Sequence, residues 1–207
     1  MTVEPRPLGR RERNKQDKLE RITVAASELF TERGVDDVTT QEIADRADVG
    51  AGTLFLYARN KGELLLLAQN AAYADALDRG ARSAAEIADP LDAVLAILRP
   101  VVECNRRQVD NGRTYLREMA FGDPEEPHHR TALEIVARTE ADVADALRRD
   151  GRVREDDAAS LAHVVSAVML LSMGATANAG AGVEEIVDDL RTQLGVILRT
   201  REPHRPR

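Results

Sequence analysis

The chain has 207 residues, of which 43% are hydrophobic and 31% charged, so it is large enough to fold around a buried core. Aromatic residues make up only 3% and tryptophan is absent, whereas Ala, Leu, Arg and Glu are abundant, which favours helices over strands. The formal charge of −7 argues against indiscriminate nucleic-acid binding. A single cysteine excludes an intramolecular disulfide, and no export signal opens the chain, so we expect a reducing, cytoplasmic setting.

Positive charge is concentrated at the N-terminal end. Residues 6–21 carry seven basic and three acidic side chains, a local balance of +4. Residues 63–207 carry 18 basic and 25 acidic side chains, a balance of −7. Because prolines and a glycine interrupt its start, residues 1–15 are expected to form a flexible basic arm that leads an acidic chain.

The first predicted helix is followed by a shorter one. From Lys18 apolar residues recur at helical spacing, and Gly34 supplies a stop signal. Thr39 or Thr40 is the expected N-cap of the second helix, with Glu42 sharing the capping of its first turn. A turn over residues 48–52 and another short helix reaching Tyr57 should follow. Two short helices joined by a tight turn after a longer helix form the helix-turn-helix pattern.

Residues 49–68 place two of the few aromatic side chains directly after a turn of small residues. Four positions here suit contacts with DNA: Ala51, Thr53, Tyr57 and Lys61. A small residue lets the helix N-terminus approach base edges, and a hydroxyl can bond there. A phenol can bond a phosphate, and an ammonium can neutralise one. The alternative is that Phe55 and Tyr57 are core aromatics of a three-helix unit.

The remainder of the chain is predicted to form long helices. Their expected ranges are 61–85, 90 onward with a kink at Pro100, 113–121, 130–149, 155–177 and 183–199. Residues 164–183 carry no charge and are long enough to span a bilayer. Their second half is rich in Gly, Asn and Thr, so a buried helix followed by a turn is the better interpretation, and we expect no membrane association.

The segment "TTQEIADRADVGAGTLFLYARNKGELL" resembles the N-terminal signature of TetR-family transcriptional regulators, with the resemblance covering about residues 16–70. It implies an all-α protein in which residues 16–76 form a helix-turn-helix DNA-binding domain, with the motif at about 39–58. Residues 77–207 would then form a larger helical bundle for effector binding and dimerisation. The chain departs from the signature at four positions: Asp48 for Gly, Gly50 for a capping residue, Phe55 for Tyr and Ala58 for Phe.

The resemblance also implies which residues contact double-stranded operator DNA. The expected set is Arg10, Arg11, Arg13, Thr39, Thr40, Gln41, Ala51, Thr53, Phe55, Tyr57 and Lys61. The arginines would reach the minor groove or backbone, the threonines and Lys61 the phosphates, and Ala51 and Thr53 the base edges. Since the recognition helix offers few hydrogen-bonding side chains, specificity is expected from thymine methyl contacts and DNA shape as well.

In such regulators the middle helices enclose an effector pocket and the last two helices form the seam of a homodimer. The expected pocket residues are Cys104, Tyr115, Met119, Phe121, Met169 and Met173. Methionines and a thiol suit an apolar ligand. Arg106, Arg107 and Arg117 could meet an anionic group, although a solvated surface is the simpler interpretation. The last two helices could instead only cover the core of one subunit.

No sequence pattern indicates catalysis. Phosphate-binding glycine motifs, nucleophile elbows and paired catalytic carboxylates are lacking, so we expect no enzyme activity and no cofactor. The segment "DPEEPHH" at 123–129 brings carboxylates and histidines together, but its two prolines indicate a surface loop rather than a metal site. We therefore expect a ligand-responsive repressor. An activator, a helical-bundle enzyme or carrier, and an architectural or docking module remain the alternatives.

Overall fold

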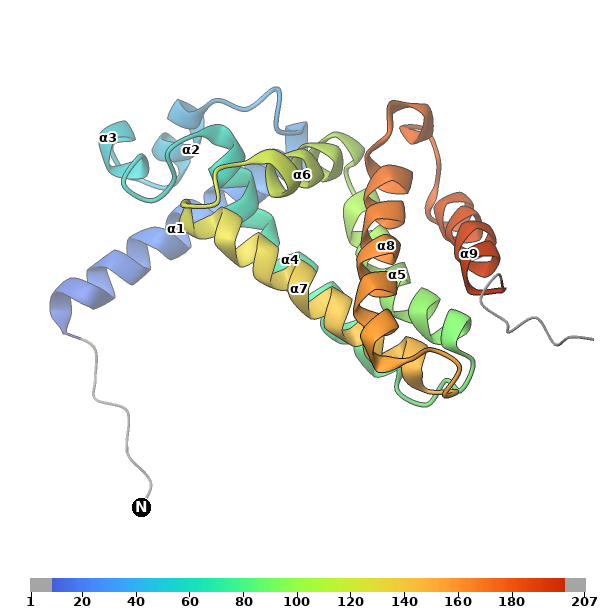
Figure 1. Ribbon diagram of the computed structural model, residues 1–207. Coiled ribbons are helices and arrows are strands. Elements are labelled where there is room, and N and C mark those ends of the chain that lie inside the picture. Colours follow the sequence, from blue (N-terminus) through green and yellow to red (C-terminus); the bar gives the residue numbers. More distant parts are fainter. Residues whose placement is uncertain (1–8, 200–207) are drawn as a thin grey trace, which may run out of the picture.

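The computed structural model describes residues 9–199, and all regular structure in that range is helical (Figure 1). The helices are α1 Arg10–Arg33, α2 Thr40–Arg46, α3 Ala51–Leu54, α4 Lys61–Ala84, α5 Pro90–Arg106, α6 Val109–Phe121, α7 Pro127–Arg148, α8 Glu155–Gly174 and α9 Val183–Arg199. A single 3-10 turn, η1 Thr176–Asn178, follows α8. The predicted all-α class is confirmed.

Helix α1 begins earlier than the sequence pattern predicts. Its first residue is Arg10, so residues 10–15, expected in a flexible arm, are helical. They are mostly strong helix formers, but their side chains are exposed and show no apolar periodicity. Residues 1–8, the rest of the expected arm, lie outside the described residues. Gly34, at φ 83°, ends α1 as predicted because glycine adopts this backbone conformation without strain.

Several further boundaries differ from the predicted ones, including the start of α6, which is Val109 rather than residue 113. Helix α3 ends at Leu54 rather than Tyr57, although hydrogen-bonded turns continue through Ala58. Helix α8 ends at Gly174, so the uncharged stretch is divided between a helix and a turn. Helix α7 begins at Pro127, where proline is favoured because its missing N–H would have no helical partner. The two histidines of the "DPEEPHH" segment therefore lie in a helix rather than a loop.

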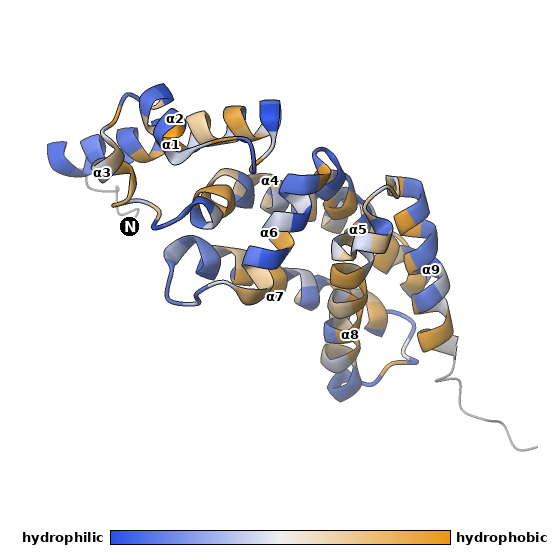
Figure 2. Ribbon diagram, turned by 90° about the horizontal axis from the view of Figure 1, so that it is seen from above, coloured by the Kyte–Doolittle hydropathy of each residue, from blue (hydrophilic) through white to orange (hydrophobic). Residues whose placement is uncertain are grey.

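The helices are arranged as a small N-terminal head and a larger body. Figures 1 and 2 show α1, α2 and α3 together at one end, with α8 and α9 at the opposite end. Helix α4 connects them, packing against α1 in the head and against α5, α6 and α7 in the body. Its approach to α5 is close: a Cβ at Gly80 would lie 2.3 Å from the backbone oxygen of Ile97, a separation that only glycine allows.

The head has an apolar core to which each of its helices contributes. Its fully buried side chains include Ile22 and Phe30 from α1, Ile43 from α2 and Leu54 from α3. Each such burial stabilises the fold by about 1.5–3 kcal/mol relative to an exposed side chain. The backbone of the short helix α3 is therefore fixed in place mainly through the burial of Leu54.

Helix α8 combines a buried side with an exposed apolar side. Of the described helices it alone is long and apolar enough to cross a membrane, a property that core helices of soluble proteins share. It packs against α6, α7 and α9, while Val164, Ala167 and Leu171 remain exposed along its outer face. The hydropathy colours of Figure 2 show this helix as largely apolar. Its outer face is thus a surface that another apolar surface would stabilise.

Candidate functional site

The start of α2 is fixed by a reciprocal capping arrangement. The backbone N–H of Glu42 donates to the Thr39 hydroxyl at 3.2 Å, and the Thr39 backbone N–H donates to the Glu42 carboxylate at 2.8 Å. This confirms Thr39 as the N-cap. The bonds from Thr39, backbone first, and the ion pair with Arg33 at 2.9 Å lower the pKa of Glu42 to about 2. Thr40 is the first residue of the helix, half-buried beside the cap.

The turn between α2 and α3 explains one departure from the family signature. Asp48, where the signature has glycine, takes a left-handed backbone conformation with φ 51°. Aspartate tolerates this conformation better than most residues. Arg21 of α1 donates to the Asp48 carboxylate at 3.2 Å, but both side chains are well exposed, so this pair contributes little stability. The turn therefore keeps its geometry without glycine.

The end of α3 and the turn after it present an exposed apolar surface next to a buried anchor. Leu54 is completely buried, whereas Phe55 is 45% and Leu56 82% exposed. The alternative that Phe55 is a core aromatic is therefore wrong. Tyr57 is half-buried, and its phenol donates to the Lys15 backbone oxygen at 3.3 Å. The first turns of α1 consequently lie beside α3.

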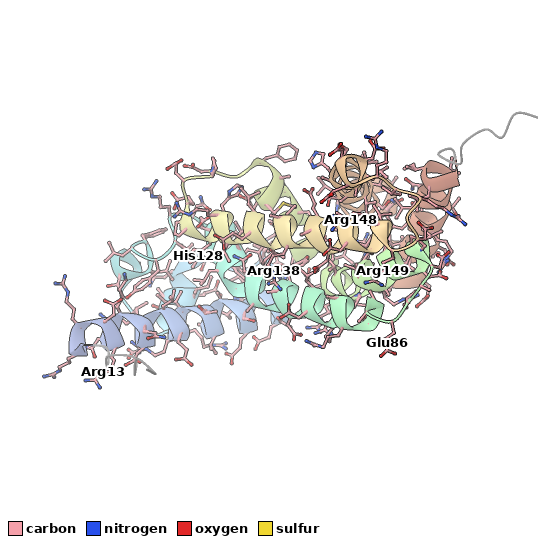
Figure 3. All side chains as sticks on the ribbon, turned by 60° about the horizontal axis from the view of Figure 1, so that its bottom comes forward. Arg13, Glu86, His128, Arg138, Arg148 and Arg149 are labelled. Atoms are coloured by element: carbon pink, nitrogen blue, oxygen red, sulfur yellow. The ribbon has the colours of Figure 1, made fainter. Side chains whose placement is uncertain are left out.

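Those first turns of α1 carry basic side chains without acidic partners. The exposed cations there are Arg10, Arg11, Arg13, Lys15 and Lys18. None of the ion pairs formed within residues 9–199 involves them. Figure 3 shows Arg13 near the outer end of α1, far from the body. Unpaired positive charge thus accompanies the exposed face of α3.

Two other predicted DNA contacts have partners within the head. The Lys61 ammonium donates to the backbone oxygens of Asp36 at 3.3 Å and Val38 at 3.2 Å, which ties the start of α4 to the loop before α2. Gln41 is exposed on α2, and its amide donates to the Asp45 carboxylate at 2.8 Å. Ala51 and Thr53 are partly exposed on α3, where no side chain caps the helix at Gly50.

A junction between head and body, absent from the sequence-based expectations, is centred on His128. Its backbone N–H donates to the Glu63 carboxylate of α4 at 3.3 Å, and its Nε2 donates to the backbone oxygen of Tyr57 at 2.8 Å. Beside it, Arg59 pairs with the buried Glu126 at 2.7 Å. Burial is the main cause that raises the pKa of Glu63. Figure 3 shows His128 at the start of α7.

A second junction joins α6 to the end of α1. The buried Asn111 donates from Nδ2 to the backbone oxygen of Phe30 at 2.8 Å and accepts from the backbone N–H of Val35 at 2.7 Å. Asn111 could have been found from the sequence only as a polar residue on the apolar face of a helix. The residues next to it in the sequence do not indicate which groups it bonds. No group of three or more His, Cys, Asp or Glu within the described range is placed to hold a metal ion.

The expected effector residues are only partly brought together. Tyr115 and Met173 are buried, Cys104, Met119 and Met169 are partly buried against the core, and Phe121 is 83% exposed. Phe121 therefore does not share an enclosed space with the others. Tyr115 stacks on Tyr73 of α4 with ring centroids 4.0 Å apart. Burial, and to a smaller extent Cys104, raises the pKa of Tyr115, so its phenol stays protonated.

A surface hollow of about 400 Å³ lies between η1, the following loop and α9. Its polar lining includes Asn178, Glu185 and Asp189, and none of the expected effector residues lines it. Glu185 caps the backbone N–H of Gly182 at 2.8 Å, and Asp189 accepts from Gln193 at 2.6 Å. These carboxylates thus have structural partners already.

Residues 22–68 match the family described as "Bacterial regulatory proteins, tetR family". No curated protein sequence matches the chain. Among solved structures, FadR from Thermus thermophilus, a TetR-family repressor in complex with lauroyl-CoA, is similar at 26% identity and a TM-score of 0.70, covering 91% of this chain and 96% of that one.

Two further structures share the fold. RolR in complex with resorcinol is 18% identical with a TM-score of 0.68, covering 94% of this chain and 96% of that one. A TetR regulator from Rhodococcus sp. RHA1 is 19% identical with a TM-score of 0.67, covering 89% and 97%. The helix-turn-helix geometry and the match of residues 22–68 identify the head as a DNA-binding domain of the TetR type, and the chain as a whole shares the fold of solved TetR-family regulators.

Proposed function

We propose that this regulator is a homodimeric, ligand-responsive repressor that binds operator DNA in the cytoplasm and leaves it when a small effector binds. The observation that carries the proposal is the exposed pair Phe55 and Leu56, in the turn that directly follows α3, next to the buried anchor Leu54. Exposed apolar side chains on a rigid head are suited to thymine methyl groups in the major groove.

In this proposal α3 enters the major groove. Ala51, Thr53 and Phe55 lie at base edges, where Thr53 contributes a hydroxyl. The phosphate-contacting set comprises Arg10, Arg11, Arg13, Thr39, Thr40, Gln41, Tyr57 and Lys61. Because Tyr57 and Lys61 already hold the head together, they position α3 as well as contact DNA. The unpaired cations of α1 supply the electrostatic attraction.

Dimerisation is proposed to use the outer face of α8, with Val164, Ala167 and Leu171 at its centre. The apolar face of α9, including Ile186, Leu190 and Leu194, is already buried within the same chain, where α9 packs against α5 and α8. A two-fold dimer would place two recognition helices about 34–36 Å apart, one turn of DNA. The operator should therefore be an inverted repeat.

The body is proposed to bind the effector among its middle helices. Two structures of similar fold, FadR and RolR, are complexes with lauroyl-CoA and resorcinol. That likeness supports a small-molecule site with an apolar lining in this chain. A ligand acts only if it binds the DNA-bound and released states with different affinity. The His128 and Asn111 junctions are the contacts through which movement of the body would reach the head.

The proposal is tested by selecting bound fragments from randomised DNA with the purified full-length protein. An enriched inverted repeat, with affinity that falls steeply as salt rises, is the expected result. The variant Arg13→Ala should weaken binding to all sequences equally and lower the salt slope by about one phosphate contact, whereas Thr53→Ala should change the selected sequence. Failure of a folded, dimeric protein to enrich any sequence contradicts the proposal.

A further inference from the structure

Arg106, in the last turn of α5, is only partly paired inside the body. Its Nη2 donates to the backbone oxygens of Met173 at 3.1 Å and Asn178 at 3.4 Å. Its Nε and Nη1 are buried and have no hydrogen-bond partner. A guanidinium carries five N–H donors, and three of them belong to these two atoms. Most of the donor capacity of this side chain is therefore unused.

An arginine in this state is energetically unfavourable. Removing the polar atoms of a charged group from water is unfavourable unless opposite charge and hydrogen bonds compensate. Several other arginines of the body have acidic partners: Arg99 pairs with Glu184 and Arg191 with Asp92, each at 2.6 Å. Within residues 9–199, Arg106 has no such partner. A cost of this kind in a protein interior indicates a functional group rather than a stabilising one.

The surroundings of Arg106 strengthen this interpretation. The Oδ1 of the adjacent Asn105 is also buried without a partner, while its Nδ2 donates to the Tyr73 hydroxyl at 3.1 Å. A second guanidinium, Arg113 of α6, donates to the backbone oxygen of Gly174 at 3.3 Å and to the Thr176 hydroxyl at 2.9 Å. The local charge is thus positive and meets only backbone and hydroxyl oxygens.

We propose that Arg106 binds an anionic oxygen of the effector, such as a carboxylate, phenolate or sulfonate, while the apolar part of the effector packs against Tyr73, Tyr115 and Met173. This inference rests on the proposed ligand-responsive function and sharpens it, because it changes the expected ligand from an apolar molecule to an amphiphilic acid. Arg107 and Arg117 are exposed and belong to the solvated surface. Burial, followed by the nearby charge of Arg113, lowers the pKa of Arg106, which an anionic partner would reverse.

Binding at Arg106 has a consequence for α8. The buried Nε and Nη1 of Arg106 adjoin no water-accessible space, so the ligand must open the contacts around the end of α8. Those contacts include the bonds from Arg106 of α5 to the backbone oxygens of Met173 and Asn178, and the bond from Arg113 of α6 to that of Gly174. An anionic oxygen reaches Nε and Nη1 only when these neighbours move apart. The ligand would therefore loosen the end of the helix that is proposed to form the dimer.

The test compares two fluorescent probes that share an apolar body. One is 1-anilinonaphthalene-8-sulfonate and the other is N-phenyl-1-naphthylamine, which has the same rings but no sulfonate. Each is titrated into the full-length protein, the variant Arg106→Met and the matched control Arg107→Met. We expect Arg106→Met to lose about tenfold or more in affinity for the sulfonate, since bonds to charged groups are of this strength, and to keep its affinity for the neutral probe.

The control Arg107→Met should bind both probes like the parent protein. The proposal is overturned if the parent does not bind the sulfonate, if both variants lose affinity equally, or if Arg106→Met loses both probes together. Circular dichroism of each variant verifies folding, and Arg106→Lys, which keeps a charge, should retain part of the sulfonate affinity. DNA selection run in parallel distinguishes the two proposals. If an operator is enriched but the probe titrations fail, only the anion site is contradicted. If the probe titrations succeed but no sequence is enriched, only the operator-binding function is contradicted.

Discussion

The head and the body differ in how completely their buried polar side chains are satisfied. Among the described residues of the head, no buried side-chain nitrogen or oxygen lacks a partner, and Thr39 and Glu42 cap α2 reciprocally. In the body three residues, Asn105, Arg106 and His129, have buried side-chain atoms without partners. Partly satisfied polar groups weaken the specification of a single packing arrangement. The head is therefore built as a fixed unit and the body as an adaptable one.

The largest effect should come from removing the anchor of the head. Leu54→Ala creates a cavity in the head core and is expected to lower the free energy of unfolding by about 2–5 kcal/mol. The neighbouring Leu56→Ala, which alters an exposed side chain, should change it by less than about 0.5 kcal/mol. Denaturant unfolding of both variants checks this. Equal effects would mean that α3 is not held by burial of Leu54.

A smaller effect is expected where α4 enters the body. In Gly80→Ala the new methyl group meets the backbone of Ile97, so overpacking should cost about 1–3 kcal/mol. Gly180→Ala, which places its methyl group in open space, is the matched control and should be close to neutral. Thermal unfolding distinguishes the two. A neutral Gly80→Ala would show that α4 and α5 can separate easily.

Removing the N-cap of α2 should lower the free energy of unfolding by less than Leu54→Ala or Gly80→Ala does. Thr39→Ala removes the N-cap of α2 and is expected to cost about 1 kcal/mol, whereas Thr31→Ala on the exposed face of α1 should be almost silent. The pKa of Glu42 is lowered to about 2, so its stabilisation is complete above the ordinary value of 4.5 and is lost as pH falls toward 2. In Thr39→Ala the stability lost between pH 4.5 and 2 should be smaller, which is checked by measuring the free energy of unfolding as a function of pH.

The smallest effect should appear at the junction between the two regions. Because burial raises the pKa of Glu63, the folded protein binds its proton more tightly than the unfolded chain does. Stability from this group is therefore greatest below the ordinary pKa of 4.5 and decreases as pH rises through the raised value. Glu63→Gln should flatten that part of the stability profile. An unchanged profile would show that another group causes the slope.

The sequence predicted best what is decided locally. Gly34 at the end of α1, the Thr39 cap and the start of α9 follow from residues within a few positions of each other. The start of α1 was missed because charged, solvated turns have no apolar periodicity. The hydrogen bonds between Glu63 and His128 and between Arg106 and Met173 join residues 65 or more positions apart, so no local sequence pattern predicts them.

Helix α4 belongs to both regions at once, and this limits how such a protein can be recombined. Its first residue, Lys61, is bonded to the loop before α2, and Gly80 lies against the backbone of α5. Asn70 of the same helix accepts from the Tyr115 hydroxyl at 2.9 Å. A chimera that receives a foreign head should therefore be joined within α4, between Lys61 and Asn70. A junction in the loop before Lys61 would separate the head from the turn of helix that completes it.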